Sequence, residues 1–142
     1  MKKVLVVYWS GTGNTEAMAK QLAKGAEDAG AGVIVKTAAE AAAGMVKNAE
    51  ALAFGCPAMG AEVLEESEME PFISGLSQDD VGGKPAVLFG SYDWGDGQWM
   101  RDWVDRMKGL NAVVEGEGII SQLVPGEDIL NACYESGKRL AG

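Results

Sequence analysis

The sequence contains no histidine and only two cysteines among its 142 residues. The lack of histidine excludes catalytic pairs of serine or cysteine with an imidazole base, and it excludes imidazole ligation of a metal. Cys56 and Cys133 lie far apart and form no C-x-x-C pair, which predicts two free thiols in a reducing compartment. Any chemistry of this chain is therefore expected to come from a bound cofactor.

Positive charge is scarce as well. The chain has 12 Lys and Arg against 21 Asp and Glu, which gives a formal net charge of −9. An acidic surface repels the phosphates of nucleic acids, so no nucleic-acid partner is expected. The same charge favours docking on basic protein surfaces, although an acidic surface can also serve solubility alone.

Long hydrophobic runs are missing too. No apolar stretch reaches the roughly 18 residues of a membrane-spanning helix, and the run at 4–9 is too short for a secretory signal. We therefore expect no membrane partner and a cytoplasmic location. The length, with 47% apolar residues, predicts a single globular domain over residues 1–142.

Apolar strands alternate with helical segments along the chain. Strands are predicted at 3–8, 33–35, 51–54 and 84–89, and a fifth at 113–114 and 119–120 with an interruption between the two pieces. Helices are predicted at 15–29, 38–47, 69–76, 98–108 and 127–140, with Trp99 and Trp103 assigned to packing. The alternation predicts an α/β fold with a parallel sheet, helices on both faces, and ligands beyond the carboxyl ends of the strands.

The loop after the first strand has the composition of an anion site. Residues 10–15 (SGTGNT) offer hydroxyls, two glycines and the start of a helix, all of which suit a phosphate. The loop is not a Walker P-loop, because no lysine follows its second glycine. A phosphate bound here would be held by neutral donors. Alternatively, Ser10 and the threonines could simply cap the helix.

Three segments together resemble the flavin-binding loops of flavodoxins, particularly the short-chain members of clostridia and related anaerobes. Residues 9–16 (WSGTGNTE) resemble the phosphate loop. Residues 55–60 (GCPAMG), with Glu62 and the run 65–68 (EESE), resemble the second loop, and residues 91–97 (SYDWGDG) resemble the third. The resemblance follows the chain in order and covers nearly its whole length.

This resemblance implies a flavodoxin-like, doubly wound, five-stranded parallel sheet of order 2-1-3-4-5 and one non-covalently bound FMN. The implied protein is a monomeric, low-potential, one-electron carrier between redox proteins, which uses the semiquinone and hydroquinone states and is not an enzyme. Carried over by position, the implied cofactor-binding residues are Ser10, Gly11, Thr12, Gly13, Asn14, Thr15, Pro57, Ala58, Met59, Gly60, Ala61, Glu62, Ser91, Tyr92, Asp93, Trp94 and Gly95.

The resemblance also implies roles. The first loop would bind the phosphate, Met59 and Trp94 would flank the flavin ring, and Glu62 would accept a hydrogen bond from the flavin N3–H. Asp93 stands where the family usually has glycine. The resemblance implies a loop that flips on reduction. With the Gly60 carbonyl turned toward the flavin, Ala61 would stand at the third position of a type II turn, which asks for a positive φ and would strain the alanine in that flipped state.

Two other functions remain open from the sequence. An FMN-dependent quinone or flavin reductase can share this fold, but it needs a substrate pocket for which this short chain has little room. A flavin-free receiver module needs an acidic cluster at the end of the first strand, where this chain has Trp9 and Ser10.

Overall fold

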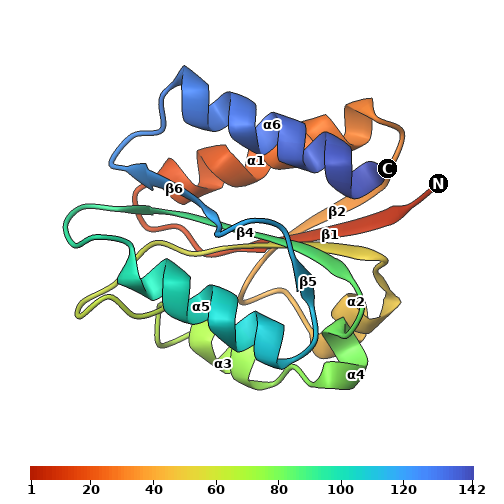
Figure 1. Ribbon diagram of the computed structural model, residues 1–142, viewed down its shortest axis with the longest axis horizontal. Coiled ribbons are helices and arrows are strands. Elements are labelled where there is room, and N and C mark those ends of the chain that lie inside the picture. Colours follow the sequence, from red (N-terminus) through yellow and green to blue (C-terminus); the bar gives the residue numbers. More distant parts are fainter.

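The computed structural model describes all residues, 1–142, and forms a three-layer arrangement of helices around one sheet (Figure 1). In chain order the elements are β1 (Lys3–Tyr8), α1 (Asn14–Asp28), β2 (Gly32–Thr37), α2 (Ala43–Asn48), β3 (Ala51–Gly55), α3 (Met69–Ser74), α4 (Gln78–Val81), β4 (Pro85–Tyr92), α5 (Gln98–Gly109), β5 (Val113–Val114), β6 (Ile119–Gln122) and α6 (Glu127–Ala141).

All strand pairs are parallel, and the sheet order is β2-β1-β3-β4-β5, with β6 also paired to β4. The predicted 2-1-3-4-5 order is thus confirmed. The predicted interruption of the last strand is confirmed as well, because β5 pairs with the start of β4 and β6 with its end. Helices α1 and α6 cover one face, and α2 to α5 cover the other (Figure 1).

The central strand β1 is covered by helices on both faces of the sheet. Its residues 4–7 are all buried, as a strand covered on both faces requires. Because side chains alternate along a strand, Val4 and Val6 belong to the core under α1 and α6, whereas Leu5 and Val7 belong to the core under the other helices.

The helices α1 and α6 approach each other through two glycines. A Cβ on Gly25 would lie 2.0 Å from the carbonyl oxygen of Tyr134, and one on Gly137 would lie 2.0 Å from that of Leu22. Any side chain at either position would force the two backbones apart.

Several predicted boundaries were wrong. The predicted helix 38–47 starts only at Ala43, and the short helix α4 was not predicted. The strand predicted to end at residue 89 continues as far as Tyr92, because β6 pairs with this stretch and extends β4. Ser91 and Tyr92 therefore belong to the end of a strand.

The two ends of the chain lie side by side at the amino ends of the strands (Figure 1). The side chain of Lys2 donates a hydrogen bond to the carbonyl oxygen of Gly142 at 3.0 Å. None of the helices combines the length and the apolar character needed to span a bilayer.

Candidate functional site

A cavity of about 280 Å³ opens at the carboxyl ends of the strands. Its lining contains every residue predicted for the cofactor except Gly13, Ala61 and Gly95, and it adds Trp9, which the predicted set lacked. The three predicted loops, which are far apart in the sequence, therefore meet at one place. This is the position at which open parallel sheets bind their ligands.

The first loop of the cavity leads directly into α1. The hydroxyl oxygen of Ser10 accepts hydrogen bonds from the backbone N–H groups of Gly13 and Glu16, at 3.1 and 3.2 Å. Ser10 thus performs the capping role that the sequence left open. The hydroxyl of Thr12 and the amide of Asn14 make no hydrogen bond to the protein, so both remain available to a ligand.

Thr15 has a different environment, because its side chain is buried. Its hydroxyl oxygen accepts a hydrogen bond from the backbone N–H of Ser91 at 3.3 Å and pairs with the Ser91 hydroxyl at 3.1 Å. Thr15 therefore links the first loop of the cavity to the end of β4, where the third loop begins.

Trp9 forms part of the cavity wall. Its ring lies beneath Gly11, where a Cβ would approach it to 3.2 Å. Its indole N–H donates to the carboxylate of Glu68 at 2.9 Å. The signal that could have added Trp9 to the predicted set was its place between a buried strand and a glycine of the phosphate loop.

The second loop folds back on itself. Met59 and Val63 form an antiparallel bridge with hydrogen bonds of 2.9 and 3.0 Å. Gly60 and Glu62 have positive φ angles of 48° and 56°, and Ala61 does not. The loop here thus does not have the type II turn expected of its flipped state. The bridge leaves Gly60, Ala61 and Glu62 at the tip of the loop, and Gly60 and Glu62 adopt the left-handed conformation.

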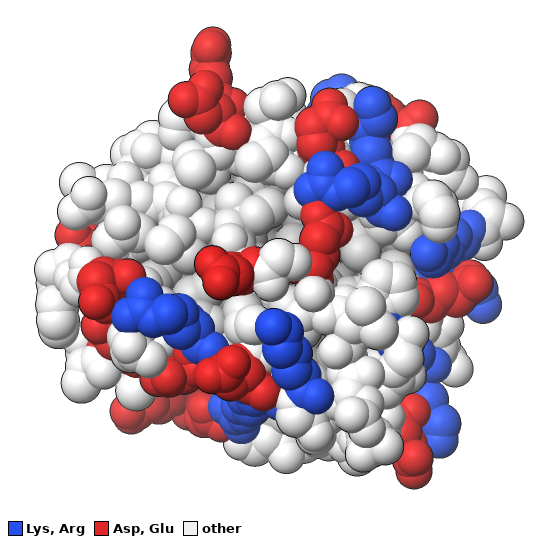
Figure 2. Space-filling model, in the orientation of Figure 1, with Lys and Arg blue, Asp and Glu red and all other residues white.

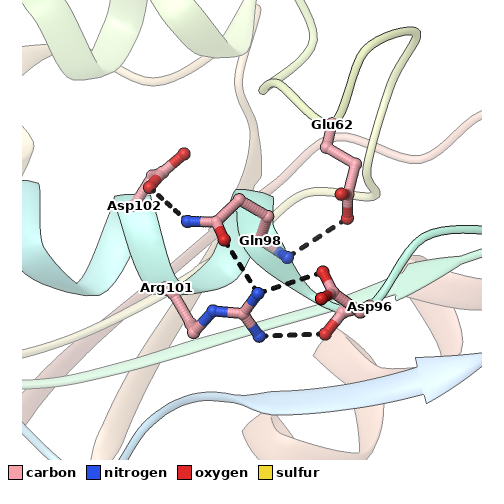
Figure 3. A network of polar contacts seen from close by, with 5 residues as sticks. All are labelled: Glu62, Asp96, Gln98, Arg101 and Asp102. Atoms are coloured by element: carbon pink, nitrogen blue, oxygen red, sulfur yellow. Dashed lines mark hydrogen bonds and ion pairs between the residues drawn. The ribbon is translucent and has the colours of Figure 1, made fainter.

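Glu62 joins the second loop to the third (Figure 3). Its carboxylate accepts a hydrogen bond from the backbone N–H of Gln98, the first residue of α5, at 3.1 Å. Gly95 packs on the same carboxylate, since a Cβ there would lie 2.5 Å from it. Glu62 thus supplies the negative charge that the start of α5 lacks on its own.

The third loop is fixed from the opposite side by Arg101 (Figure 3). The guanidinium donates to the backbone oxygen and to the carboxylate of Asp96, both at 3.0 Å, and to the side-chain oxygen of Gln98 at 2.8 Å. No lysine or arginine lines the cavity itself, whereas Glu62 and Asp93 do. The cavity is therefore acidic on one side and has only neutral donors on the other.

Behind the second loop, Glu65 is buried and caps α3. Its carboxylate accepts hydrogen bonds from the backbone N–H groups of Ser67, Glu68 and Met69, at 2.9, 2.7 and 3.0 Å, and from the Ser67 hydroxyl. Burial opposes the ionisation of Glu65, but these hydrogen bonds outweigh it and lower the pKa of the carboxyl.

The cysteines take no part in the site. Both are free, and burial raises the pKa of Cys56 and of Cys133 to about 12, so neither is a ready thiolate at neutral pH. No group of three or more Cys, Asp and Glu side chains is placed so that it could hold a metal ion.

The tryptophans divide as the sequence indicated. Trp99 and Trp103 are buried in the core, which confirms their packing role, and Trp99 donates to the carbonyl oxygen of Cys56 at 3.1 Å. Trp94, by contrast, lines the cavity with 64% of its surface exposed. A flat apolar ring, together with a free hydroxyl and a free amide at a helix start, lines this one cavity and fits a ligand that has both an aromatic ring and a phosphate.

Known proteins are similar to this chain in sequence and fold over nearly its whole length. Residues 6–137 match the family described as Flavodoxin. The chain is 48% identical to a flavodoxin of Clostridium beijerinckii, covering 96% of this chain and 97% of that protein, and 41% identical to a flavodoxin of Megasphaera elsdenii, covering 97% and 98%. The solution structure of two-electron reduced Megasphaera elsdenii flavodoxin superposes with a TM-score of 0.85 at 40% identity, covering 97% of this chain and 98% of that chain.

Proposed function

Because the chain belongs to the flavodoxin family, whose members carry electrons on a bound FMN, we propose that the cavity loops hold the phosphate, the ring and the pyrimidine edge of that cofactor. The protein is an electron carrier and not an enzyme, and a reductase function is not favoured. The observation that carries the residue assignment is the meeting of the three loops in one cavity.

The phosphate is assigned to the first loop. Thr12 and Asn14 offer side chains with no partner in the protein, and the positive end of the α1 dipole points at the same place. Ser10, whose hydroxyl already binds two backbone N–H groups, keeps the loop in shape, and Thr15 anchors it to Ser91. Neutral donors and a helix dipole then balance the phosphate charge without a cation.

The ring is assigned to the space between the second and third loops. Met59 is a flexible side chain that adapts to a flat surface, and Trp94 is a planar one, so the two can flank the ring from opposite sides. Covering the exposed Trp94 with the ring removes apolar surface from water, which favours binding.

The pyrimidine edge is assigned to Glu62, to Ala58 and to the backbone of the third loop. Bound FMN accepts and releases single electrons, and the carboxylates of Glu62 and Asp93 make the gain of negative charge unfavourable. A carboxylate about 10 Å away opposes an added electron by roughly 0.4–1.7 kcal/mol, depending on the local dielectric. This corresponds to some tens of millivolts toward a lower potential for each charge.

The net charge of the protein indicates the kind of partner that it binds. With a net charge of −9, redox partners with basic docking surfaces are attracted at long range and at low ionic strength. We assign residues 1–142 to one FMN-binding domain that acts as a monomer in the cytoplasm.

The test is a titration of apoprotein with FMN and with riboflavin, followed by quenching of flavin fluorescence. FMN is expected to bind far more tightly, because riboflavin lacks the phosphate. Thr12→Ala should weaken FMN binding by about 1.5–3 kcal/mol, which is the scale of a hydrogen bond to a charged group. The affinity for riboflavin should not change. Thr12→Ser keeps the hydroxyl and serves as the control. Equal affinities for the two flavins would refute the assignment of the phosphate to this loop.

A further inference from the structure

A second cavity shares Glu62 with the cofactor cavity. It has a volume of about 130 Å³ and lies where the second loop, α3 and α5 meet. Its lining includes Glu62, Glu70, Asp102, Trp103 and Arg106. One water molecule takes about 30 Å³ in the liquid, so the second cavity has room for several.

The indole N–H of Trp103, which lines this cavity, has no partner in the protein. Trp103 is only 1% exposed, and its nitrogen is the one buried side-chain nitrogen or oxygen that makes no hydrogen bond. The indole of Trp99 donates to the Cys56 carbonyl oxygen at 3.1 Å. The indole of Trp9 donates to Glu68 at 2.9 Å. Burying an N–H without an acceptor is unfavourable, and the second cavity is the space beside the Trp103 ring in which an acceptor can lie.

The charged groups around the second cavity leave two acceptors free. Arg106 donates to both carboxylate oxygens of Glu70, at 2.8 and 2.6 Å, so these two side chains satisfy each other. Glu62 and Asp102 each have one oxygen bound by Gln98, through its backbone N–H at 3.1 Å and its side-chain amide at 2.8 Å (Figure 3). The other oxygen of each carboxylate has no donor within the protein. Water can therefore accept from the indole and donate to these oxygens.

The surroundings favour water over an apolar ligand. Figure 2 shows acidic and basic side chains over α5, the helix that forms one wall of the second cavity. A buried water molecule needs two to four polar partners, and the cavity offers an N–H donor and carboxylate oxygens. An apolar ligand would leave these groups without partners.

Glu62 connects the second cavity to the proposed cofactor, because it lines both cavities. FMN bound in the first cavity would displace water from that side of Glu62. A carboxylate that loses hydration without gaining equal partners is strongly disfavoured. Water in the second cavity would keep part of the hydration of Glu62 when the first cavity is filled.

We propose that the second cavity is a hydration site, in which ordered water accepts the indole N–H of Trp103 and donates to the carboxylate of Glu62. Trp103 is then a positioning residue that acts on the flavin ring through this water and Glu62. This role rests on the proposed function, because it needs FMN beside Glu62. The water hydrogens, turned toward the carboxylate, weaken its negative field at the flavin. The more negative one-electron potential of bound FMN is therefore less negative than it would be beside an unhydrated Glu62.

The first experiment detects the water in wild-type protein that is loaded with FMN and isotopically labelled at nitrogen. Rotating-frame Overhauser spectra at the water frequency show which indole protons lie beside long-lived water, and their sign separates this proximity from proton exchange. The Trp103 indole is expected to give a cross-peak with water. The Trp99 indole, buried on the same helix but bound to a carbonyl oxygen, is the internal control and should give none. Absence of the Trp103 cross-peak would overturn the proposal.

The second experiment compares Trp103→Phe with Met107→Leu. The first variant keeps an aromatic ring and removes the N–H, whereas the second alters a buried residue of α5 that does not line the cavity. Trp103→Phe should weaken the binding of FMN and of riboflavin by the same factor, about 2- to 10-fold, which is the effect of one net hydrogen bond. Its more negative one-electron potential should become still more negative. Met107→Leu should leave both affinities and the potential unchanged.

The outcomes distinguish this proposal from the proposed function. Affinities and a potential at wild-type values in Trp103→Phe, or shifts equal to those of Met107→Leu, would overturn the proposal and leave the proposed function intact. The cross-peak of the wild-type protein decides for or against the water even where a variant does not fold. A wild-type protein that shows the cross-peak but binds no FMN would overturn the proposed function, and with it the role of Trp103 toward the flavin.

Discussion

The helix layers on the two faces of the sheet differ in the side chains that fill them. Above one face, α1 and α6 meet through small residues, and the backbones touch at Gly25 and Gly137. Above the other face, the core is filled by large side chains such as Trp99 and Trp103, and the helices α2, α3 and α4 are short.

The two layers carry different loops of the cavity. The close-packed layer contains α1, which packs against α6 and follows the proposed phosphate loop. The other layer supports the second and third loops, which meet the proposed flavin ring. There Gly60 and Glu62 have positive φ angles, as Gly13 does in the first loop. The first loop thus leads into a helix that is closely packed on its neighbour, whereas the second loop leads into the short helix α3.

The contrast in packing predicts the largest effect for Gly137→Ala. The new Cβ would meet backbone atoms of Leu22 and Ala26, which cannot move aside, so the loss of stability should be about 3 kcal/mol or more. Urea unfolding at a fixed FMN concentration measures it. Gly44→Ala in α2 is the matched control, because nothing lies within 4 Å of its Cβ, and it should be neutral or stabilising. Similar losses in both would contradict the difference between the layers.

The link between the two regions of the cavity is tested by Thr15→Val. Valine keeps the shape but leaves the buried N–H of Ser91 without its partner, which should cost about 1–3 kcal/mol. Both apoprotein stability and FMN affinity should fall, whereas Thr12→Ala should affect affinity alone. Thr15→Ser retains the hydroxyl as a control. A variant that loses FMN affinity with unchanged apoprotein stability would show that Thr15 serves the ligand and not the link.

The layer of α2 to α5 contains the buried carboxylate of Glu65. Its lowered pKa means that its stabilising effect is complete above the ordinary glutamate pKa of about 4.3 and is lost as the pH falls through the lower, folded value. Glu65→Gln should cost about 1–2 kcal/mol at neutral pH, and the difference from wild type should shrink in acid. Unfolding curves across this pH range check it, with the exposed neighbour in Glu66→Gln as control. A difference that does not vary with pH would rule out ionised Glu65 as the cap.

The smallest effect is expected for Asp93→Asn. Removal of one exposed carboxylate beside the proposed pyrimidine edge should raise the more negative one-electron potential of bound FMN by some tens of millivolts at low salt, and by less at high salt. A spectroelectrochemical titration measures it, and Asp79→Asn on α4 at the far end of the sheet is the control. An unchanged potential at both salt concentrations would show that Asp93 points away from the cofactor.

The sequence predicted the alternating strands and helices and the loops of the cavity because these depend on local patterns, whereas the sheet order followed from the resemblance to flavodoxins. Continuous apolar runs identified β1 and β3, and glycines and hydroxyls after the first strand identified the phosphate loop. Helix α4 was missed although Ser77 and Asp80 form a capping box, since four residues are too few for a periodic pattern.

What the sequence could not predict depends on distant contacts. The extension of β4 to Tyr92 needs the pairing with β6, and the partner of Thr15 is 76 residues away. The conformation of the loop tip, with positive φ at Gly60 and Glu62, depends on the bridge between Met59 and Val63, which turn preferences of single residues do not reveal.

The proximity of the chain ends has a consequence for the architecture of larger proteins. Since Lys2 contacts Gly142 on the edge away from the cavity, a polypeptide attached at either end starts on the side opposite the cofactor loops. Short linkers could also join the ends, so that circular permutants opened at exposed loops should retain the fold. The unit is thus suited to transplantation, as a cassette that can be spliced into other proteins with its redox face left free.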